Sequence, residues 1–143
     1  MAGSIEMSMT NVQVGGINST PSNSDFNVQV PRLPPVITNV RLLNRSSGGF
    51  DVEVTGYSTS REIGTATFTF GAASGANLLT VELQPDVTST FTTYYQSDDS
   101  APAGGAFVYL QPFLVQQGDA NVVTSVTVTL SNAQGTSEPK TAR

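Results

Sequence analysis

The chain has 143 residues, of which only 12% are charged, a formal net charge of −5, and no cysteine, histidine or tryptophan. The absence of cysteine and histidine excludes disulfides, thiolate metal sites and most acid–base or triad chemistry, so we expect no enzyme, no metal and no cofactor. The scattered basic residues form no stripe for nucleic acid, and no apolar run of about 18 residues or more is present to span a membrane. A glycosidase built on paired acids is the remaining catalytic alternative. It needs two carboxylates about 5–9.5 Å apart across a cleft, and the 11 scattered acids give no sign of one.

Residues 1–31 are predicted to form an N-terminal β-arm. The start, Met1 to Ser4, has neither a basic region nor an apolar segment, so it indicates a leader on an excised piece rather than a signal peptide. Apolar residues then alternate along one strand and change parity near Thr10-Asn11, which predicts a bulge there. After a loop over residues 15–25, Phe26–Val30 is predicted as the second strand.

These two strands should share one apolar face. Its members, which are our candidate self-association residues, are Ile5, Met7, Met9, Val12, Val14, Phe26, Val28 and Val30. An isolated two-stranded hairpin is marginally stable in water, so this face is expected to pack on a partner.

Three prolines at positions 31, 34 and 35 predict a boundary after the arm. Proline cannot donate to a sheet ladder and favours an extended, semi-rigid segment. We therefore assign residues 32–35 to a proline linker and residues 36–143 to the main domain, which ends in a short C-terminal tail.

The main domain is predicted to be all-β. Alternation in Thr65–Phe70 places Ala66 and Phe68 on one face and threonines on the other, as in a half-buried antiparallel strand. The only helical candidate is a turn near Ser60–Ile63. The predicted strands are Val36–Leu43, Phe50–Tyr57, Thr65–Phe70, Leu78–Leu83, Val87–Tyr95, Ala106–Val115 and Val123–Ser131. About seven such strands, separated by turn signals, favour an immunoglobulin-like antiparallel β-sandwich, with a small closed barrel as the alternative.

The same alternation predicts which side chains face the core. They are Val40, Leu42, Phe50, Val52, Val54, Ala66, Phe68, Phe70, Leu79, Val81, Leu83, Phe107, Tyr109, Phe113, Val126, Val128 and Leu130.

A family resemblance spans about three-quarters of the chain, in line with the length of one domain. It rests on the stretches Pro35–Val40, Ser47–Glu62, Ala66–Phe70, Phe91–Ser97 and Val126–Ser137. These resemble an immunoglobulin-like module of large secreted and surface proteins from soil bacteria, although similar modules often carry tryptophan at the Tyr94 position. The resemblance implies an extracellular or cell-surface location and an end or spacer role in a repetitive protein. The arm is similar to the last two strands of a preceding module.

Three groups of residues are candidate sites in the main domain. Asp98, Asp99 and Asp119 could supply oxygen ligands for Ca²⁺, but no complete calcium loop is present and solvated loop acids are the favoured interpretation. Arg61-Glu62 could form an exposed corner that recognises a partner. The favoured interpretation is a turn between strands in which Arg61 pairs with a nearby carboxylate.

The third candidate site is an aromatic platform for sugar stacking. Its residues would be Tyr94-Tyr95-Gln96 with Tyr57 and Tyr109. Aromatic strand residues are more often core or cross-strand partners, and no tryptophan strengthens the platform, so a core role is favoured.

Together these features predict a non-enzymatic structural module of an extracellular bacterial protein. It would self-associate through its N-terminal strands into a fibre or stalk, with other copies or adjacent immunoglobulin-like modules as partners. The alternative is a carbohydrate- or ligand-binding module that acts through loop tips and tyrosines, with a glycan as partner.

Overall fold

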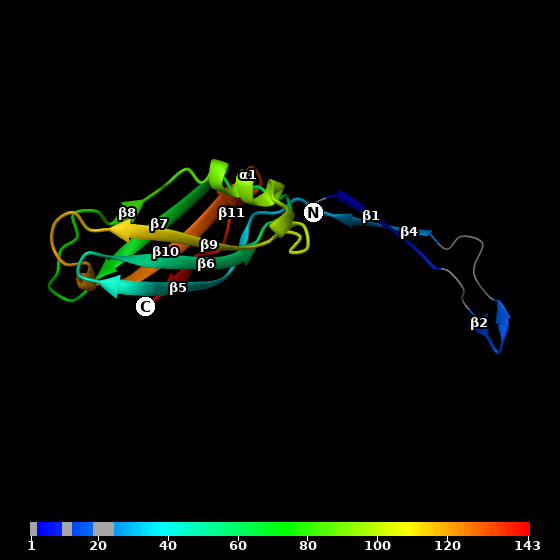
Figure 1. Cartoon of the computed structure of the whole chain (residues 1–143), viewed down its shortest axis with the longest axis horizontal. Helices are drawn as coiled ribbons and strands as arrows, with labels where there is room; N and C mark the ends of the chain where they lie inside the picture. The colour runs from blue at the N-terminus through cyan, green and yellow to red at the C-terminus, as the bar shows by residue number, and fades with distance from the viewer. Residues whose placement is uncertain (1–2, 10–12, 19–24) are drawn as a thin grey trace.

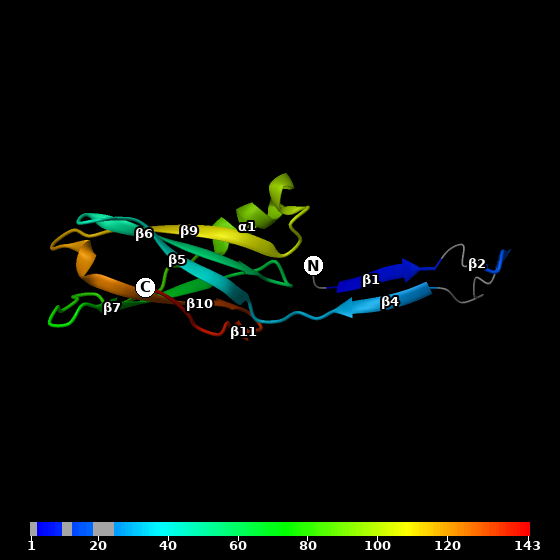
Figure 2. The same ribbon diagram turned by 90° about the horizontal axis from the view of Figure 1, so that it is seen from below.

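The structure is a computed structural model that describes residues 3–9, 13–18 and 25–143. It consists of antiparallel β-strands with one α-helix, and it has two parts (Figure 1). We call residues 1–31 the arm and residues 32–143 the body. The arm projects from one end of the body, along the long axis of the molecule, in both ribbon views (Figures 1 and 2).

The arm contains two hairpins. Strand β1 (Gly3–Ser8) pairs antiparallel with β4 (Asp25–Val30), which confirms the strand Phe26–Val30 and the start of the first predicted strand. The predicted continuation of that first strand to Val14 is wrong, because β1 ends at Ser8 and Val14 pairs with Ile17 in a separate hairpin. We call this pair the arm hairpin. A shorter pair, β2 (Gln13–Val14) and β3 (Ile17–Asn18), lies within the segment between them, so the predicted loop over residues 15–25 contains a strand. Gly15 and Gly16 both have positive φ (59° and 82°) in the turn of this pair, as a two-residue type I′ hairpin turn requires. The bulge predicted at residues 10 and 11 lies outside the described residues.

The body contains two antiparallel sheets. The first has the order β5-β6-β9, with β5 at Val36–Ser46, β6 at Gly49–Tyr57 and β9 at Ala106–Leu114. The second has the order β11-β10-β7-β8, formed by β7 (Thr65–Ala72), β8 (Glu82–Leu83), β10 (Val123–Asn132) and β11 (Gly135–Thr136). Strand β12 (Lys140–Ala142) also pairs with β10, and Ala142 is buried, so the predicted C-terminal tail is part of the sheet.

One hydrophobic core joins the two sheets. Val52 and Val54 from the first sheet and Phe68, Val126 and Val128 from the second are fully buried in the same cluster. These residues alternate along their strands, and inward-facing residues of period two are what a two-layer β core requires. The predicted core is confirmed except at three positions described below.

The predicted strand Val87–Tyr95 is wrong, because this segment forms helix α1 (Thr88–Gln96). Its apolar residues Phe91 and Tyr95 are four apart and both buried, which is the spacing of one helix face. The Phe91 ring packs on Phe107 and Tyr109 of β9 at centroid distances of 5.1 and 5.3 Å. Tertiary packing on β9 therefore outweighs the strand preference of a threonine-rich sequence.

The predicted strand Leu78–Leu83 is also largely wrong. Only β8, at its C-terminal end, pairs with β7, and a single further backbone bond joins Phe70 N–H to Val81 C=O at 2.8 Å. Leu79, Val81 and Leu83, predicted to face the core, are instead exposed.

The proline segment 32–35 is docked on the body. Asn132 Nδ2 donates to Leu33 C=O at 3.0 Å, and Leu33 N–H donates to Thr59 Oγ1 at 3.1 Å. Pro35 is fully buried, and Arg32 lies 3.6 Å from Glu62 in an exposed ion pair. The segment is thus a fixed base for the arm rather than a loose tether.

Candidate functional site

The first candidate surface is the apolar face of the arm hairpin. In its register Ile5 lies opposite Val28 and Met7 opposite Phe26, so four apolar side chains share one face. Each of these side chains is between 42% and 52% exposed. Among the described residues, no hydrogen bond or ion pair links β1 or β4 to the body. An exposed apolar face of this kind makes the arm hairpin a candidate interaction surface.

The other face of the arm hairpin is polar. Ser4 lies opposite Gln29, and the Ser4 hydroxyl donates to the Asn27 side chain. Glu6, opposite Asn27, belongs to this face as well. The hairpin is therefore amphipathic, with one face suited to water and one to a partner.

The arm residues outside the hairpin carry further apolar surface. Met9 is 39% exposed, and Val14 lies opposite Ile17 in the second hairpin, where both are largely exposed. Val30, at the end of β4, is half-buried. Val12, the remaining candidate residue, lies outside the described residues.

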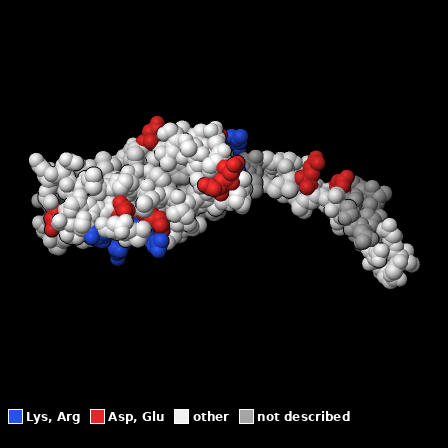
Figure 3. Space-filling view, viewed as in Figure 1, with Lys and Arg blue, Asp and Glu red and all other residues white. Residues whose placement is uncertain are grey.

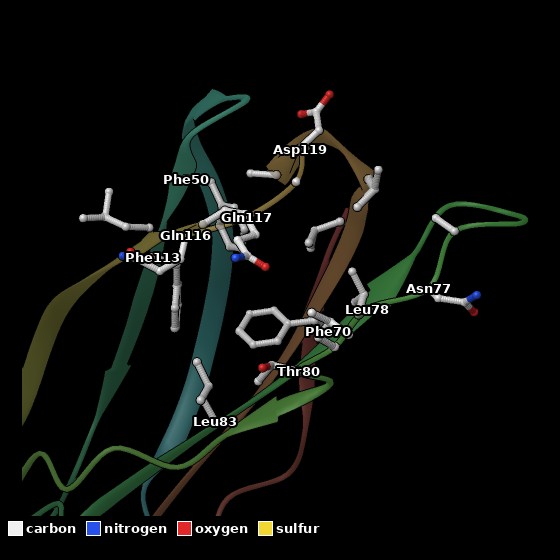
Figure 4. Close-up of a pocket in the computed structure, with 18 residues that line it drawn as sticks. Phe50, Phe70, Asn77, Leu78, Thr80, Leu83, Phe113, Gln116, Gln117 and Asp119 are labelled. Carbon is white, nitrogen blue, oxygen red and sulfur yellow. The ribbon is translucent and has the colours of Figure 1, made fainter.

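The second candidate surface is a cleft of about 820 Å³ in the body (Figure 4). It lies between residues 76–83, which run beside β7, and residues 113–119, which form the end of β9 and the loop after it. Its walls are mostly apolar and include Phe50, Phe70, Leu78, Leu83, Phe113 and Val115. Asp119 is the one charged residue among those that line it.

Aromatic contacts between the two sheets form the floor of the cleft. The Phe113 ring of β9 lies 5.2 Å from Phe70 and 5.0 Å from Phe68 of β7, both edge to face. Phe50 of β6 lies 5.5 Å from Phe113. The two edge-to-face pairs have the geometry that aromatic side chains prefer, so the floor is well packed. Phe70 and Phe113 are half-buried, and both line the cleft.

The rim of the cleft combines apolar and polar groups. Leu79 is 96% exposed and Leu114 is 80% exposed on opposite sides of the opening. The Asp119 carboxylate accepts the Asn121 N–H at 2.9 Å and so caps the 3₁₀ turn Ala120–Val122. In the view of Figure 3, charged side chains are sparse over both the body and the arm.

The structure does not bring the three predicted calcium ligands together. Asp98 and Asp99 lie in the 3₁₀ turn before β9, whereas Asp119 lies after it, so the strand separates them. Within the described ranges, no group of three acidic side chains is arranged to hold a metal ion.

Arg61 has a structural role, and the predicted pairing with a carboxylate is wrong. Its guanidinium donates to the Tyr95 carbonyl and, at 2.8 Å, to Ser100 Oγ, and it lies 5.3 Å from the centroid of the Tyr95 ring. These contacts fasten α1 and the following 3₁₀ turn to the loop after β6. Glu62 pairs with Arg32 instead.

The four tyrosines of the predicted platform do not share an exposed face. Tyr95 and Tyr109 are buried in the core, and Tyr95 Oη donates to Gly105 C=O at 2.8 Å. Tyr94 is half-buried and donates to Ala106 C=O, whereas Tyr57 is exposed. A sugar platform built from these residues is therefore not formed.

The cleft was not predicted from the sequence, because the residues around it were predicted to lie in strands. The signal that could have found it is Pro85, which follows Leu78–Leu83 closely and cannot donate to a sheet ladder. A proline next to a strand limits the pairing of that strand, so apolar residues of the neighbouring strand stay exposed.

No family model, curated protein or solved structure matches this chain. In the part of the chain that the structure describes, no helix is long and apolar enough to cross a membrane.

Proposed function

We propose that this chain is a non-enzymatic structural module that self-associates through its arm hairpin into a fibre or stalk. Its body is an immunoglobulin-like β-sandwich, and it acts in an extracellular or cell-surface protein of a bacterium. The observation that carries the proposal is the contrast between a body whose core cluster is buried between two sheets and an arm whose apolar face is uncovered.

The extracellular part of the proposal is supported by the family resemblance and by a composition rich in uncharged polar residues, with only 12% of residues charged. The immunoglobulin-like assignment is supported by two antiparallel sheets around one core.

The energetics favour a partner that covers the whole arm face. Fully burying a large apolar side chain contributes about 1.5–3 kcal/mol, so covering the exposed half of Ile5, Met7, Phe26 and Val28 contributes roughly 4 kcal/mol. Association costs about 4–15 kcal/mol in lost rigid-body freedom. A stable contact therefore also needs backbone hydrogen bonds or further apolar surface.

A second function is favoured by the cleft, namely binding of an apolar small molecule. Its volume of about 820 Å³ and its apolar walls are typical of ligand sites. In this second function the ligand binds in the cleft, whereas the ligand-binding alternative predicted from the sequence relied on the tyrosines. A thermal-shift screen with fatty acids and aromatic compounds tests it, and a stabilisation that Leu79→Glu abolishes would favour it over self-association.

Sedimentation velocity of the full chain, from micromolar to millimolar concentration, tests the leading proposal. We expect the average mass of the wild-type chain to rise with concentration. Met7→Glu, which places a charge on the apolar face, should keep the chain monomeric, whereas the control Gln29→Glu places the same group on the polar face and should leave association unchanged. A wild-type chain that stays monomeric at millimolar concentration contradicts the proposal.

A further inference from the structure

We infer that the cleft of the body receives the arm hairpin of a second copy, so that copies join head to tail. This inference rests on the proposed function and names the surface that accepts the arm. Both surfaces are apolar and uncovered in the described parts of the arm and the body.

A chain cannot place its arm hairpin in its own cleft. The segment that follows the arm enters the first sheet at Val36, which pairs with Tyr57, and Tyr57 pairs with Ala106. Phe113 and Leu114 of the cleft lie at the opposite end of β9. Nine strand residues at about 3.3 Å each separate the two ends by roughly 25–30 Å. Residues 32–35 are fixed to the body, so they cannot carry the arm back over that distance.

The backbone beside the cleft offers an edge for a further strand. Residues 77–81 run along the outer side of β7, and among the described residues no hydrogen-bond partner is found for the N–H groups of Leu79 and Thr80. The facing edge of β9 is closed at Pro112, which lacks an N–H and whose carbonyl accepts from Gln111 Nε2 at 2.9 Å. An incoming hairpin therefore pairs with residues 77–81 and lays its apolar face on the cleft.

The apolar side chains along this edge also favour contact with the arm hairpin of a second copy. Leu79, Val81 and Leu83 are apolar at every second position, and they are 96%, 58% and 41% exposed. Leu79 and Leu83 line the cleft, so they leave apolar surface there that this chain does not cover. The arm hairpin carries complementary apolar side chains, with Ile5 and Met7 opposite Val28 and Phe26.

Charge favours the same arrangement. The arm has no basic residue, and its two acids are Glu6 and Asp25. Glu6 belongs to the polar face, which stays in water when the apolar face is covered. The cleft presents only Asp119, which already caps a 3₁₀ turn at the rim. Neither surface buries an unpaired charge in the contact.

Such a contact joins two different surfaces and is therefore heterologous. Each copy uses its arm at one end and its cleft at the other, so the assembly grows as an open chain unless the rotation closes a ring.

Disulfide trapping in the full chain tests the inference, because the chain has no cysteine of its own. We expect a Met7→Cys, Leu79→Cys double variant to form a ladder of covalent oligomers on mild oxidation, and an equimolar mixture of the two single variants to form a covalent heterodimer. The controls are Gln29→Cys on the polar face of the arm and Val108→Cys, an exposed residue of β9 outside the cleft. Neither control should crosslink when it replaces its counterpart.

A second measurement uses non-covalent variants. Met7→Glu has a defective arm and Leu79→Glu a defective cleft, so each should be monomeric while their mixture forms a heterodimer that grows no further. Val108→Glu should associate like the wild type.

The outcomes separate this inference from the proposed function. One set of results would show that the arms pair with each other. In that case the wild type and Leu79→Glu associate, Met7→Glu does not, and Met7→Cys crosslinks only to itself. The cleft inference is then wrong, and the proposed function stands. If the wild type does not associate at all, both fail.

Discussion

The arm and the body follow the same local pattern but reach opposite outcomes. Phe68 in β7 and Phe26 in β4 both sit on the apolar face of an antiparallel strand, yet Phe68 is fully buried and Phe26 is 45% exposed. Alternation thus fixes which face of a strand is apolar, whereas the presence of a second layer decides whether that face is covered. The chain itself supplies a second layer over Phe68 in the body, and it supplies none over Phe26 in the arm.

The test with the largest expected effect replaces each of these two phenylalanines by alanine. We expect Phe68→Ala to lower the free energy of unfolding of the body by about 3–5 kcal/mol, because it leaves a cavity between the sheets. Phe26→Ala, the same change in the arm, should alter it by less than about 0.5 kcal/mol. Thr67→Ala, on the opposite face of β7, should also cost far less than Phe68→Ala. Urea unfolding of the monomeric chain measures all three, and equal losses for Phe68→Ala and Thr67→Ala would contradict the register of β7.

A second test removes the side chain that fastens α1 to the body. Arg61→Ala loses the charged hydrogen bonds to Tyr95 C=O and Ser100 Oγ, so we expect a loss of about 2 kcal/mol. Arg61 also has a positive φ of 56°, so Arg61→Gly should cost less than Arg61→Ala. The control is Arg41→Ala, which breaks a partly exposed pair with Glu53 and should cost about 0–1 kcal/mol. A loss for Arg61→Ala no larger than that of the control would show that these contacts contribute little.

A third test uses alkaline pH. Burial, with a smaller effect of Tyr94, raises the pKa of Tyr95 well above its usual value of 10.0, and burial also raises the pKa of Tyr109. The unfolded chain loses these protons near pH 10 while the folded body keeps them. The stability of the body is therefore complete below pH 10 and falls as the pH rises above it.

Tyr95→Phe separates the titration from the packing. It should cost about 1 kcal/mol at neutral pH, because the hydrogen bond to Gly105 C=O is lost, and it should reduce the fall in stability above pH 10. Melting temperatures between neutral pH and pH 11 measure both effects. An unchanged alkaline slope would mean that Tyr95 ionises normally in the folded body.

The smallest expected effect is that of deleting residues 1–31. The body should keep its free energy of unfolding within about 0.5 kcal/mol, because residues 32–35 retain their own contacts and the arm hairpin contributes nothing to the core. The truncated chain should be a folded monomer by circular dichroism and light scattering. A large loss of stability would show that the arm packs on the body of its own chain.

The sequence by itself determined most of the strands and the core. Alternation at Ala66, Phe68 and Phe70 or at Val126, Val128 and Leu130 is enforced by the pleat, since successive side chains point to opposite sides of the backbone whatever the neighbours are. The strand Phe26–Val30 and the start of the first arm strand could be predicted for the same reason.

Only the tertiary structure decided the helix, the cleft and the role of Arg61. The segment Thr88–Gln96 has strand-like composition, and it is helical because Phe91 fills the space over Phe107 and Tyr109, residues that lie more than one element away. Leu79, Val81 and Leu83 have the pattern of core residues, and they are exposed because no further strand of this chain covers them. Local sequence sets the intrinsic preference of a segment, whereas burial depends on partners distant in the chain, which is why these features could be seen only in the folded molecule.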